Sequence, residues 1–117
     1  MISSINGSIS ALKALGKKVA VAADNVANLQ SKGFKKKRAV LQEGQQKQVT
    51  VQIEKIDTPG PIVTEIEGEK IVEKELSNVD LVEEIPQTIV TQRHYEANLK
   101  AVQTQDEVLK TIVDLKG

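Results

Sequence analysis

The 117-residue chain contains no cysteine and no tryptophan, and it has only one phenylalanine and one tyrosine. Without cysteine the chain cannot form a disulfide, a zinc–thiolate site or a thiol nucleophile. Large aromatic rings dominate compact cores, so their scarcity favours slender helix pairs over a thick globule. The length and composition therefore predict at most one domain of extended, helical character.

Net charge is also lacking, because 16 basic and 16 acidic side chains cancel. This balance argues against generic electrostatic binding to nucleic acid or to an anionic membrane. No window approaches the roughly 18 uninterrupted apolar residues of a membrane span. The first residues interleave isoleucine with serine, asparagine and glycine, unlike a signal peptide. We expect a soluble chain whose N-terminus stays uncleaved if it is exported.

Residues 3–29 are patterned as one long amphipathic helix, which a serine at position 3 or 4 can cap. Apolar or small residues recur at alternating intervals of three and four, the spacing of a coiled-coil seam. Gly7 and Gly16 each weaken a helix by about 1 kcal/mol relative to alanine, so we expect residues 1–15 to depend on packing partners. The seam positions are Ile2, Ile5, Ile9, Leu12, Gly16, Val19, Ala23 and Val26.

A second long helix is expected from about residues 78–80 to residue 116. Asp80 followed by Glu83 has the spacing of a capping box, with aspartate in the usual Ser/Thr place. Pro86 lies too deep for a first-turn proline, so we expect it to kink this helix or to delay its start. Asp106 forms a polar break in the seam. The apolar seam positions are Tyr95, Leu99, Val102, Leu109 and Val113.

The middle of the chain changes to strand patterning. Residues 48–56 alternate between apolar and polar, which indicates a half-buried strand. Residues 57–61 read Asp-Thr-Pro-Gly-Pro and predict a turn, and residues 62–66 and 70–75 then predict a hairpin. Residues 43–46 are predicted as a loop. The residues expected on the inner face of the first strand are Val49, Val51 and Ile53.

His94 is the only histidine. A metal site would need further ligands and a catalytic triad would need a nucleophile, and its helical neighbours Val90 and Asn98 supply neither. We interpret His94 as a partly exposed polar residue. We predict no enzyme activity, no metal, no cofactor and no small-molecule substrate.

Residues 35–38, Lys-Lys-Lys-Arg, form the densest charged run. Such a run is a candidate for phosphate contacts. The zero net charge and the absence of a nucleic-acid-binding motif favour a solvated strand edge, or pairing with an acidic neighbouring subunit. We therefore predict no nucleic-acid partner.

Asn25 and Asn28 are poor helix formers that lie off the predicted seam. A fraying helix end explains Asn28 alone. The whole segment of residues 23–29, Ala-Asp-Asn-Val-Ala-Asn-Leu, has a second explanation: small residues permit close approach, and the amides hydrogen-bond to another chain.

Residues 23–29, followed by Gly33-Phe34-Lys35, resemble the N-terminal signature of the bacterial flagellar rod and hook proteins, roughly A-x-N-[VLI]-A-N-x…G-[FY]-[KR]. Residues 77–84 resemble the opening of the C-terminal helix in that family, and residues 92–98 match its Q-R-x-[YF]-x-A-N signature. The short middle and the last residues are most similar to the proximal-rod type.

This resemblance implies a structural subunit of the flagellar basal-body rod in the periplasm. It implies an α+β fold in which long N- and C-terminal helices pair as an antiparallel coiled coil with a short central β element. Its partners would be other rod subunits, copies of itself and the flagellar type III export apparatus. We divide the chain into an N-terminal rod helix (1–33), a small β region (34–76) and a C-terminal rod helix (77–117), which form one structural unit.

The seams and the family signatures together give the residues expected at subunit interfaces. They are Ile5, Ile9, Leu12, Val19, Asn25, Val26, Asn28, Gly33, Phe34, Asn78, Asp80, Gln92, Arg93, Tyr95, Asn98, Leu99, Val102 and Leu109. The alternative is a cytoplasmic coiled-coil adaptor or export chaperone, which predicts a stable dimer retained in the cytoplasm. A nucleic-acid-binding module ranks third, and an enzyme last.

Overall fold

The computed structural model describes the backbone of residues 2–116 and the side chains of residues 5–115. The molecule is elongated, with extents of 83 × 24 × 18 Å. Its radius of gyration is 20.9 Å, against about 13 Å for a compact chain of this length. The elements, in chain order, are α1 (Ile2–Ala27), β1 (Lys37–Glu43), the 3-10 turn η1 (Gln45–Lys47), β2 (Val49–Lys55), β3 (Ile62–Glu67), β4 (Lys70–Glu75) and α2 (Leu81–Lys116).

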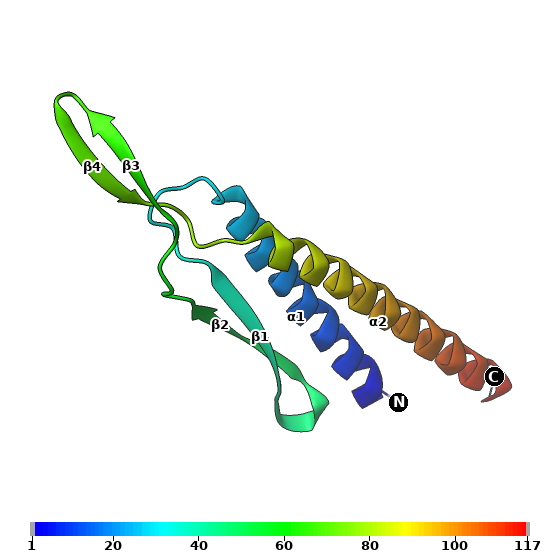
Figure 1. Cartoon of the computed structure of the whole chain (residues 1–117). Helices are drawn as coiled ribbons and strands as arrows, with labels where there is room; N and C mark the ends of the chain where they lie inside the picture. Colours follow the sequence, from blue (N-terminus) through cyan, green and yellow to red (C-terminus); the bar gives the residue numbers. More distant parts are fainter. Residues whose placement is uncertain (1, 117) are drawn as a thin grey trace.

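The two helices lie side by side and run antiparallel (Figure 1). Asn25, near the end of α1, donates a hydrogen bond to Glu84 near the start of α2. Ser8, near the start of α1, donates to Gln105 far along α2. This reversed order confirms the predicted α+β fold with paired terminal helices. At about 1.5 Å per residue, α2 is roughly 15 Å longer than α1, so it extends beyond the described part of α1.

Helix α1 ends two residues earlier than predicted. The side chain of Asn28 folds back onto α1, where its Nδ2 donates to the carbonyl oxygen of Asp24 at 2.8 Å, and its Oδ1 accepts from Ser31 at 3.0 Å. Asparagine competes with the helix for backbone partners in this way, which is why it favours helix ends. The predicted cap at residue 3 or 4 is wrong in position, because α1 already includes Ile2 and both residues lie within the helix.

Helix α2 begins directly after Asp80, whose Oδ1 accepts from the backbone N–H of Val82 at 3.0 Å. Asp80 is thus the N-cap, as predicted. The carboxylate of Glu83 pairs with Lys36 instead of completing the capping box. The expectation that Pro86 delays the start of the helix is wrong, because α2 runs through Pro86 without interruption.

The middle of the chain forms two separate antiparallel hairpins, β1–β2 and β3–β4. The hairpin predicted for residues 62–75 is confirmed, with Gly68 at its tip in a left-handed conformation (φ 64°). Strand β1 was not predicted from the sequence, and the loop predicted at residues 43–46 is wrong for Glu43, which pairs with Val49. The basic start of β1 conceals its alternation, because Lys37 and Arg38 are both exposed.

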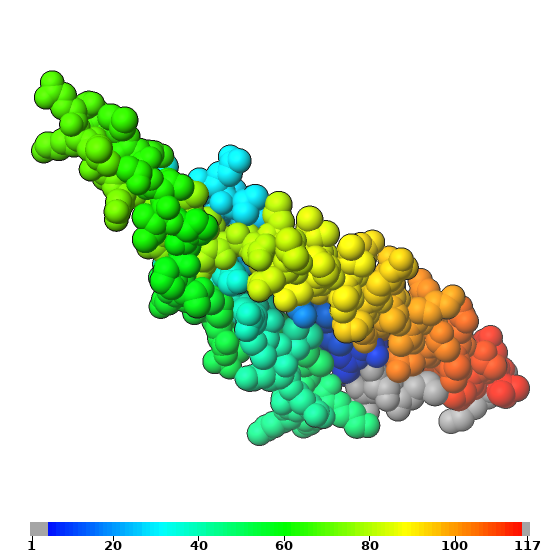
Figure 2. Space-filling view, viewed as in Figure 1, coloured from blue at the N-terminus to red at the C-terminus, as the bar shows by residue number. Residues whose placement is uncertain are grey.

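The hairpin β1–β2 packs along α1. The hydroxyl of Ser10 accepts from the backbone N–H of Val49 at 2.8 Å and donates to its carbonyl oxygen at 2.9 Å. Val49 and Val51 are half-buried as predicted, whereas Ile53 is 54% exposed. Hairpin β3–β4 projects beyond the helices, at the end of the molecule opposite the start of α1 (Figures 1 and 2).

Candidate functional site

The two helices and hairpin β1–β2 meet at a junction that is centred on Asn25. This side chain is only 1% exposed. Its Nδ2 donates to the carbonyl oxygen of Lys37 at 2.8 Å and to Oε1 of Glu84 at 3.1 Å. Its Oδ1 accepts from the backbone N–H of Lys37 at 3.0 Å. One amide therefore joins α1, β1 and α2, and buried polar groups need such partners.

Asn78, which precedes α2, holds the neighbouring residue in the same manner. Its Oδ1 accepts from the backbone N–H of Lys36 at 2.6 Å. Its Nδ2 donates to the carbonyl oxygens of Ile56 at 2.8 Å and Thr58 at 2.9 Å. One asparagine in α1 and one just before α2 thus bind the backbone N–H groups of two consecutive residues, Lys36 and Lys37, where the chain enters β1. We call Asn25, Asn78 and the residues they bind the asparagine junction.

Two glycines form the neck between this junction and hairpin β3–β4. A Cβ on Gly60 would lie 2.1 Å from the carbonyl oxygen of Leu76, so only glycine permits this approach. Gly33 has φ 71°, and its N–H donates to the carbonyl oxygen of Glu75 at 2.9 Å. The signature glycine at position 33 therefore serves a backbone turn that few other residues adopt without strain.

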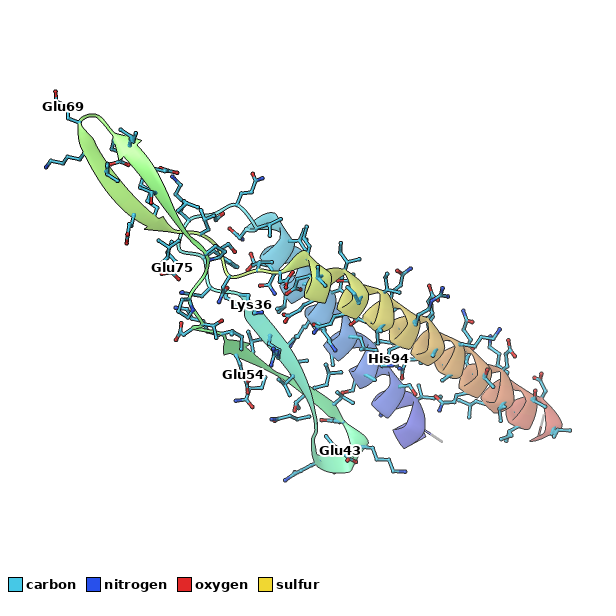
Figure 3. All side chains as sticks on the ribbon, viewed as in Figure 1. Lys36, Glu43, Glu54, Glu69, Glu75 and His94 are labelled. Carbon is cyan, nitrogen blue, oxygen red and sulfur yellow. The ribbon has the colours of Figure 1, made fainter. Side chains whose placement is uncertain are left out.

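Most of the basic run is paired with acidic residues inside the chain. Lys35 pairs with Glu75, Lys36 with Glu83 at 2.8 Å, and Lys37 with Asp24 at 3.8 Å. Figure 3 shows Lys36 and Glu75 at the junction.

Lys35 and Lys36 lower the pKa of the carboxyl groups with which they pair. The hydrogen bond from Lys35, followed by that from the N–H of Gly60, lowers the pKa of Glu75. The hydrogen bond from Lys36 lowers the pKa of Glu83. The lysines are therefore engaged in holding the neck and the start of α2 together, which leaves them less free for phosphate contacts.

A groove of about 240 Å³ opens beside the junction, between α1, β1 and the first turns of α2. Its lining mixes basic and acidic side chains, among them Lys18, Arg38, Glu83 and Glu84. Within residues 5–115, no group of three or more His, Cys, Asp or Glu side chains is placed to hold a metal ion. His94 is exposed on α2 (Figure 3) and does not line this groove.

Neither α1 nor α2, as far as the structure describes them, offers the apolar length that a membrane span requires.

The face that α2 turns toward α1 is largely polar. Fully or half-buried residues recur along it at intervals of three, four or seven, and Glu84 and Thr91 are the most buried of them, at 6% and 2% exposure. Of the seam predicted on α2, Val102 and Leu109 lie on this face, whereas Leu99 and Val113 lie beside it, at 41% and 61% exposure. The α1-facing positions are Glu84, Thr88, Thr91, Asn98, Val102, Gln105 and Leu109.

The seam predicted on α1 likewise coincides only in part with the buried face of that helix. Ala14, Leu15 and Asn25 are the buried residues of α1, whereas Val19 and Val26 are 38% and 42% exposed. We expected apolar stripes to close the helices on each other and amides to face neighbours. The structure places Asn25 inside, and much of the apolar stripe faces outward.

The expected interface residues divide into two sets of equal size. The first set is buried or half-buried within the chain: Ile5, Leu12, Asn25, Asn28, Phe34, Asn78, Asn98, Val102 and Leu109. The second set is exposed: Ile9, Val19, Val26, Gly33, Asp80, Gln92, Arg93, Tyr95 and Leu99. The structure brings Asn25, Asn78, Gly33 and Phe34 together at the junction, and it leaves the remaining exposed residues along the outer helix faces.

Three residues of the site were not anticipated from the sequence: Ser10, Gly60 and Glu84. Gly60 had a usable signal, because a glycine between two prolines marks a constrained turn. Ser10 and Glu84 had none, since their partners lie 39 and 59 residues away in the chain.

Large apolar side chains are exposed in several parts of the molecule. Val82 and Leu115 on α2 are 79% and 83% exposed, and Ile66 and Ile71 on hairpin β3–β4 are 76% and 73% exposed. Such surfaces are typical of chains that bind other proteins.

Comparison with known proteins adds matches at both ends of the chain. The family model described as flagella basal body rod protein matches residues 5–35. The model described as flagellar basal body rod FlgEFG protein C-terminal matches residues 74–115. Together the two matched segments cover more than half of the chain, and they include the junction asparagines and both paired helices.

Individual relatives are similar over shorter stretches. The flagellar hook protein FlgE of Escherichia coli is 48% identical over 42 residues, which are 36% of this chain and 10% of that protein. The flagellar basal-body rod protein FlgG of Bacillus subtilis is also 48% identical over 42 residues, 16% of its length. The FlgE of Helicobacter pylori is 47% identical over 51 residues, 7% of its length. The matches thus span about a sixth or less of each relative.

The fold and the junction define an elongated α+β chain whose terminal helices pair directly and are linked to the start of hairpin β1–β2 by Asn25 and Asn78. The sequence matches lie on those same helices. The chain belongs to the flagellar basal-body rod family.

Proposed function

We propose that the chain is a structural subunit of the flagellar basal-body rod, which assembles helically with copies of itself and with other rod subunits. The family matches at both helices support this role. The observation that carries it is the outward-facing apolar surface of the paired helices, including Val82 and Leu99 on α2. In a rod this surface would be covered by neighbouring subunits.

The proposal includes export through the flagellar type III apparatus, the subtype of the proximal rod and a final place in the periplasm. The flagellar family supports export, and the small hairpins between the helices support the proximal subtype. The division into regions 1–33, 34–76 and 77–117 likewise stays a prediction. The structure couples these regions closely, because Asn25 and Asn78 tie both helix regions to the β region.

The direct test is immunodetection in hook–basal bodies purified from the bacterium that encodes the chain, with a gene-deletion strain as the control. We expect the chain in the purified particles and a loss of swimming in the deletion strain. Removal of residues 1–15, which are expected to contribute to export, should prevent incorporation. A chain found only in the cytoplasm as a stable dimer would contradict the proposal and favour an adaptor or export chaperone.

A further inference from the structure

Hairpin β3–β4 has one apolar face that nothing in the described part of the chain covers. Ile62, Ile66 and Ile71 are 63%, 76% and 73% exposed. Ile66 pairs directly with Ile71, and Ile62 lies four residues before Ile66 on the same strand, so all three side chains project from one face. A two-stranded hairpin standing alone in water is marginally stable. This face therefore needs a partner.

The surroundings of this face are acidic. Residues 62–75 contain four glutamates and two lysines besides Glu75 at their end, and Lys74 is already paired with Glu65 and Glu67. Glu73 and Glu69 make no ion pair with any side chain in residues 5–115. Glu73 lies on the apolar face, opposite Thr64, and Glu69 is at the hairpin tip (Figure 3). The partner surface should be apolar and basic.

Helix α1 has such a surface. Ile9, Gly16 and Ala20 are exposed on its outer side, and the exposed side chains of Lys13 and Lys17 flank them. Neither lysine forms an ion pair within the part of the chain whose side chains are described. This outer face of α1 complements the hairpin in both polarity and charge.

The exposed apolar face at the start of α2 fits less well. Val82, Ile85 and Ile89 are 79%, 53% and 53% exposed, but Glu83 lies beside them. The nearest basic residue along the helix, Arg93, already faces Glu96 at 3.8 Å. Glu83 is itself paired with Lys36, so this stretch of α2 offers the acidic hairpin no unpaired lysine, whereas α1 offers Lys13 and Lys17. Charge therefore favours α1 as the acceptor.

We propose that the β3–β4 hairpin of one copy docks its isoleucine face on the outer face of α1 in a second copy. The hairpin and the first half of α1 lie at opposite ends of the molecule (Figure 1). The contact therefore joins two different surfaces, which makes it head-to-tail and able to propagate into an open filament. This inference rests on the proposed rod function and specifies how successive copies touch.

The natural absence of cysteine permits a disulfide test in hook–basal bodies. The double variant Ile71→Cys with Ala20→Cys is oxidised and separated without reductant. We expect a ladder of linked multimers, because each copy carries both halves of the contact. Either single variant can link two copies at most. The matched control, Ile71→Cys with Ile85→Cys, should give no ladder.

The outcomes separate this inference from the proposed function. A chain that is present in hook–basal bodies but gives no ladder, or gives one with the control pair, overturns the docking inference alone. A link between the hairpin cysteine and a different protein would overturn it as well. A chain that is absent from hook–basal bodies overturns the rod function, and the docking inference with it.

Charge reversal tests the acceptor independently. Glu73→Lys in the double-cysteine background should reduce the ladder several-fold, and adding Lys17→Glu should restore it. The control Glu54→Lys changes an exposed acidic residue on β2 and should leave the ladder unchanged. Loss without restoration would reject α1 as the acceptor surface.

Discussion

The two hairpins are of similar length and share an antiparallel pairing, yet they are supported in different ways. Hairpin β1–β2 is joined to α1 through Ser10 and Asn25, and its Ala39 is one of the few buried apolar residues. Hairpin β3–β4 is joined to the rest of the chain mainly at its base. One face of this hairpin carries the ion pairs of Lys74 with Glu65 and Glu67. The opposite face exposes isoleucines.

This difference shows which hairpin is stabilised by packing within the chain and which is not. An isolated two-stranded hairpin gains too little from its ladder to be stable in water. The first hairpin obtains the missing support from α1, which packs along it. The second is held within residues 5–115 by contacts of Gly33 and Lys35 with Glu75 at its base and by the ion pair of Lys32 with Glu65, and no helix packs along it. The second hairpin is therefore the part of the fold whose stability depends most on assembly.

The largest effect should come from removing the link that holds the first hairpin. Asn25→Ala leaves the N–H and carbonyl of Lys37 and one oxygen of Glu84 without their partner. Each buried unsatisfied group costs about 1–3 kcal/mol, so we expect a loss of about 3 kcal/mol in the free energy of unfolding. Urea denaturation followed by circular dichroism measures it, and the variant should make β1–β2 as weakly held as β3–β4.

Asn28→Ala is the matched control for this prediction. Asn28 belongs to the same signature, but its hydrogen bonds stay within the end of α1 and its side chain is outside the junction. We expect a change of about 0.5 kcal/mol, the usual scale for surface substitutions. Equal losses in the two variants would refute the bridging role of Asn25.

The second effect concerns the neck of the second hairpin. Gly60→Ala would place a Cβ 2.1 Å from the carbonyl oxygen of Leu76, so the backbone must shift. Overpacking of this kind costs about 1–3 kcal/mol. Hydrogen exchange should show faster opening of β3–β4 than of β1–β2, which would widen the difference between the hairpins.

Gly16→Ala is the control with the opposite sign. No atom lies within 4 Å of a Cβ at Gly16, and alanine favours a helix by about 1 kcal/mol relative to glycine. The isolated chain should therefore become more stable. Destabilisation by both substitutions would show that the space around Gly60 is not the cause.

Much of this comparison could not be predicted from the sequence. The alternation in residues 62–75 predicted the second hairpin correctly, because its turn and strands are encoded locally. Strand β1 was missed because charged residues open it and because Ala39 is buried by α1, a partner that no local pattern reveals. Asp80 was recognisable as a cap since its bond to Val82 is also local.

The apolar seams predicted on the two helices were only partly correct, for a related reason. Periodic apolar residues such as Val19 and Val26 show that a helix has an apolar face, but they do not say which partner covers it. The polar residue Asn25 was rightly singled out from the sequence, yet its partners depend on the tertiary position of β1. Sequence analysis thus identified residues of the junction without predicting the contacts that they make.

The third effect is a smaller loosening of the first hairpin. Ser10→Ala removes the hydroxyl that both donates to and accepts from Val49. A typical hydrogen bond contributes about 1 kcal/mol, and we expect a loss of that size. The Val49 amide should exchange faster, while β3–β4 amides stay unchanged. Ser8→Ala is the control, because Ser8 makes a single long bond of 3.4 Å to Gln105; an equal loss there would contradict the prediction.

The smallest effect is a dependence on pH that should appear in the second hairpin. Hydrogen bonds from Lys32 and then Lys74 lower the pKa of Glu65 from its ordinary 4.5, and Lys35 lowers that of Glu75. A carboxyl with a lowered pKa stabilises the fold above its ordinary pKa, and this contribution is lost as the pH falls through the lowered value. Protection of β3–β4 amides, after correction for the intrinsic exchange rate, should therefore stay level from pH 7 to about 5 and decline below 4.5.

The Ser10 hydroxyl and the Lys37 backbone groups that anchor the first hairpin do not titrate in this range. The lowered pKa of Glu83 concerns only its contact with Lys36, just before β1, so β1–β2 should lose less protection than β3–β4 as the pH falls. Glu65→Gln provides the internal control, since glutamine cannot carry the charge that pairs with Lys32 and Lys74. This variant should show weaker protection of β3–β4 at pH 7 and a shallower decline on acidification. Because these side chains are exposed, high salt should reduce the same protection by screening. If both hairpins lost protection equally, the ion pairs would not be what distinguishes them, and the isoleucine face would be left as the main difference between a hairpin that α1 supports and one that awaits a neighbour.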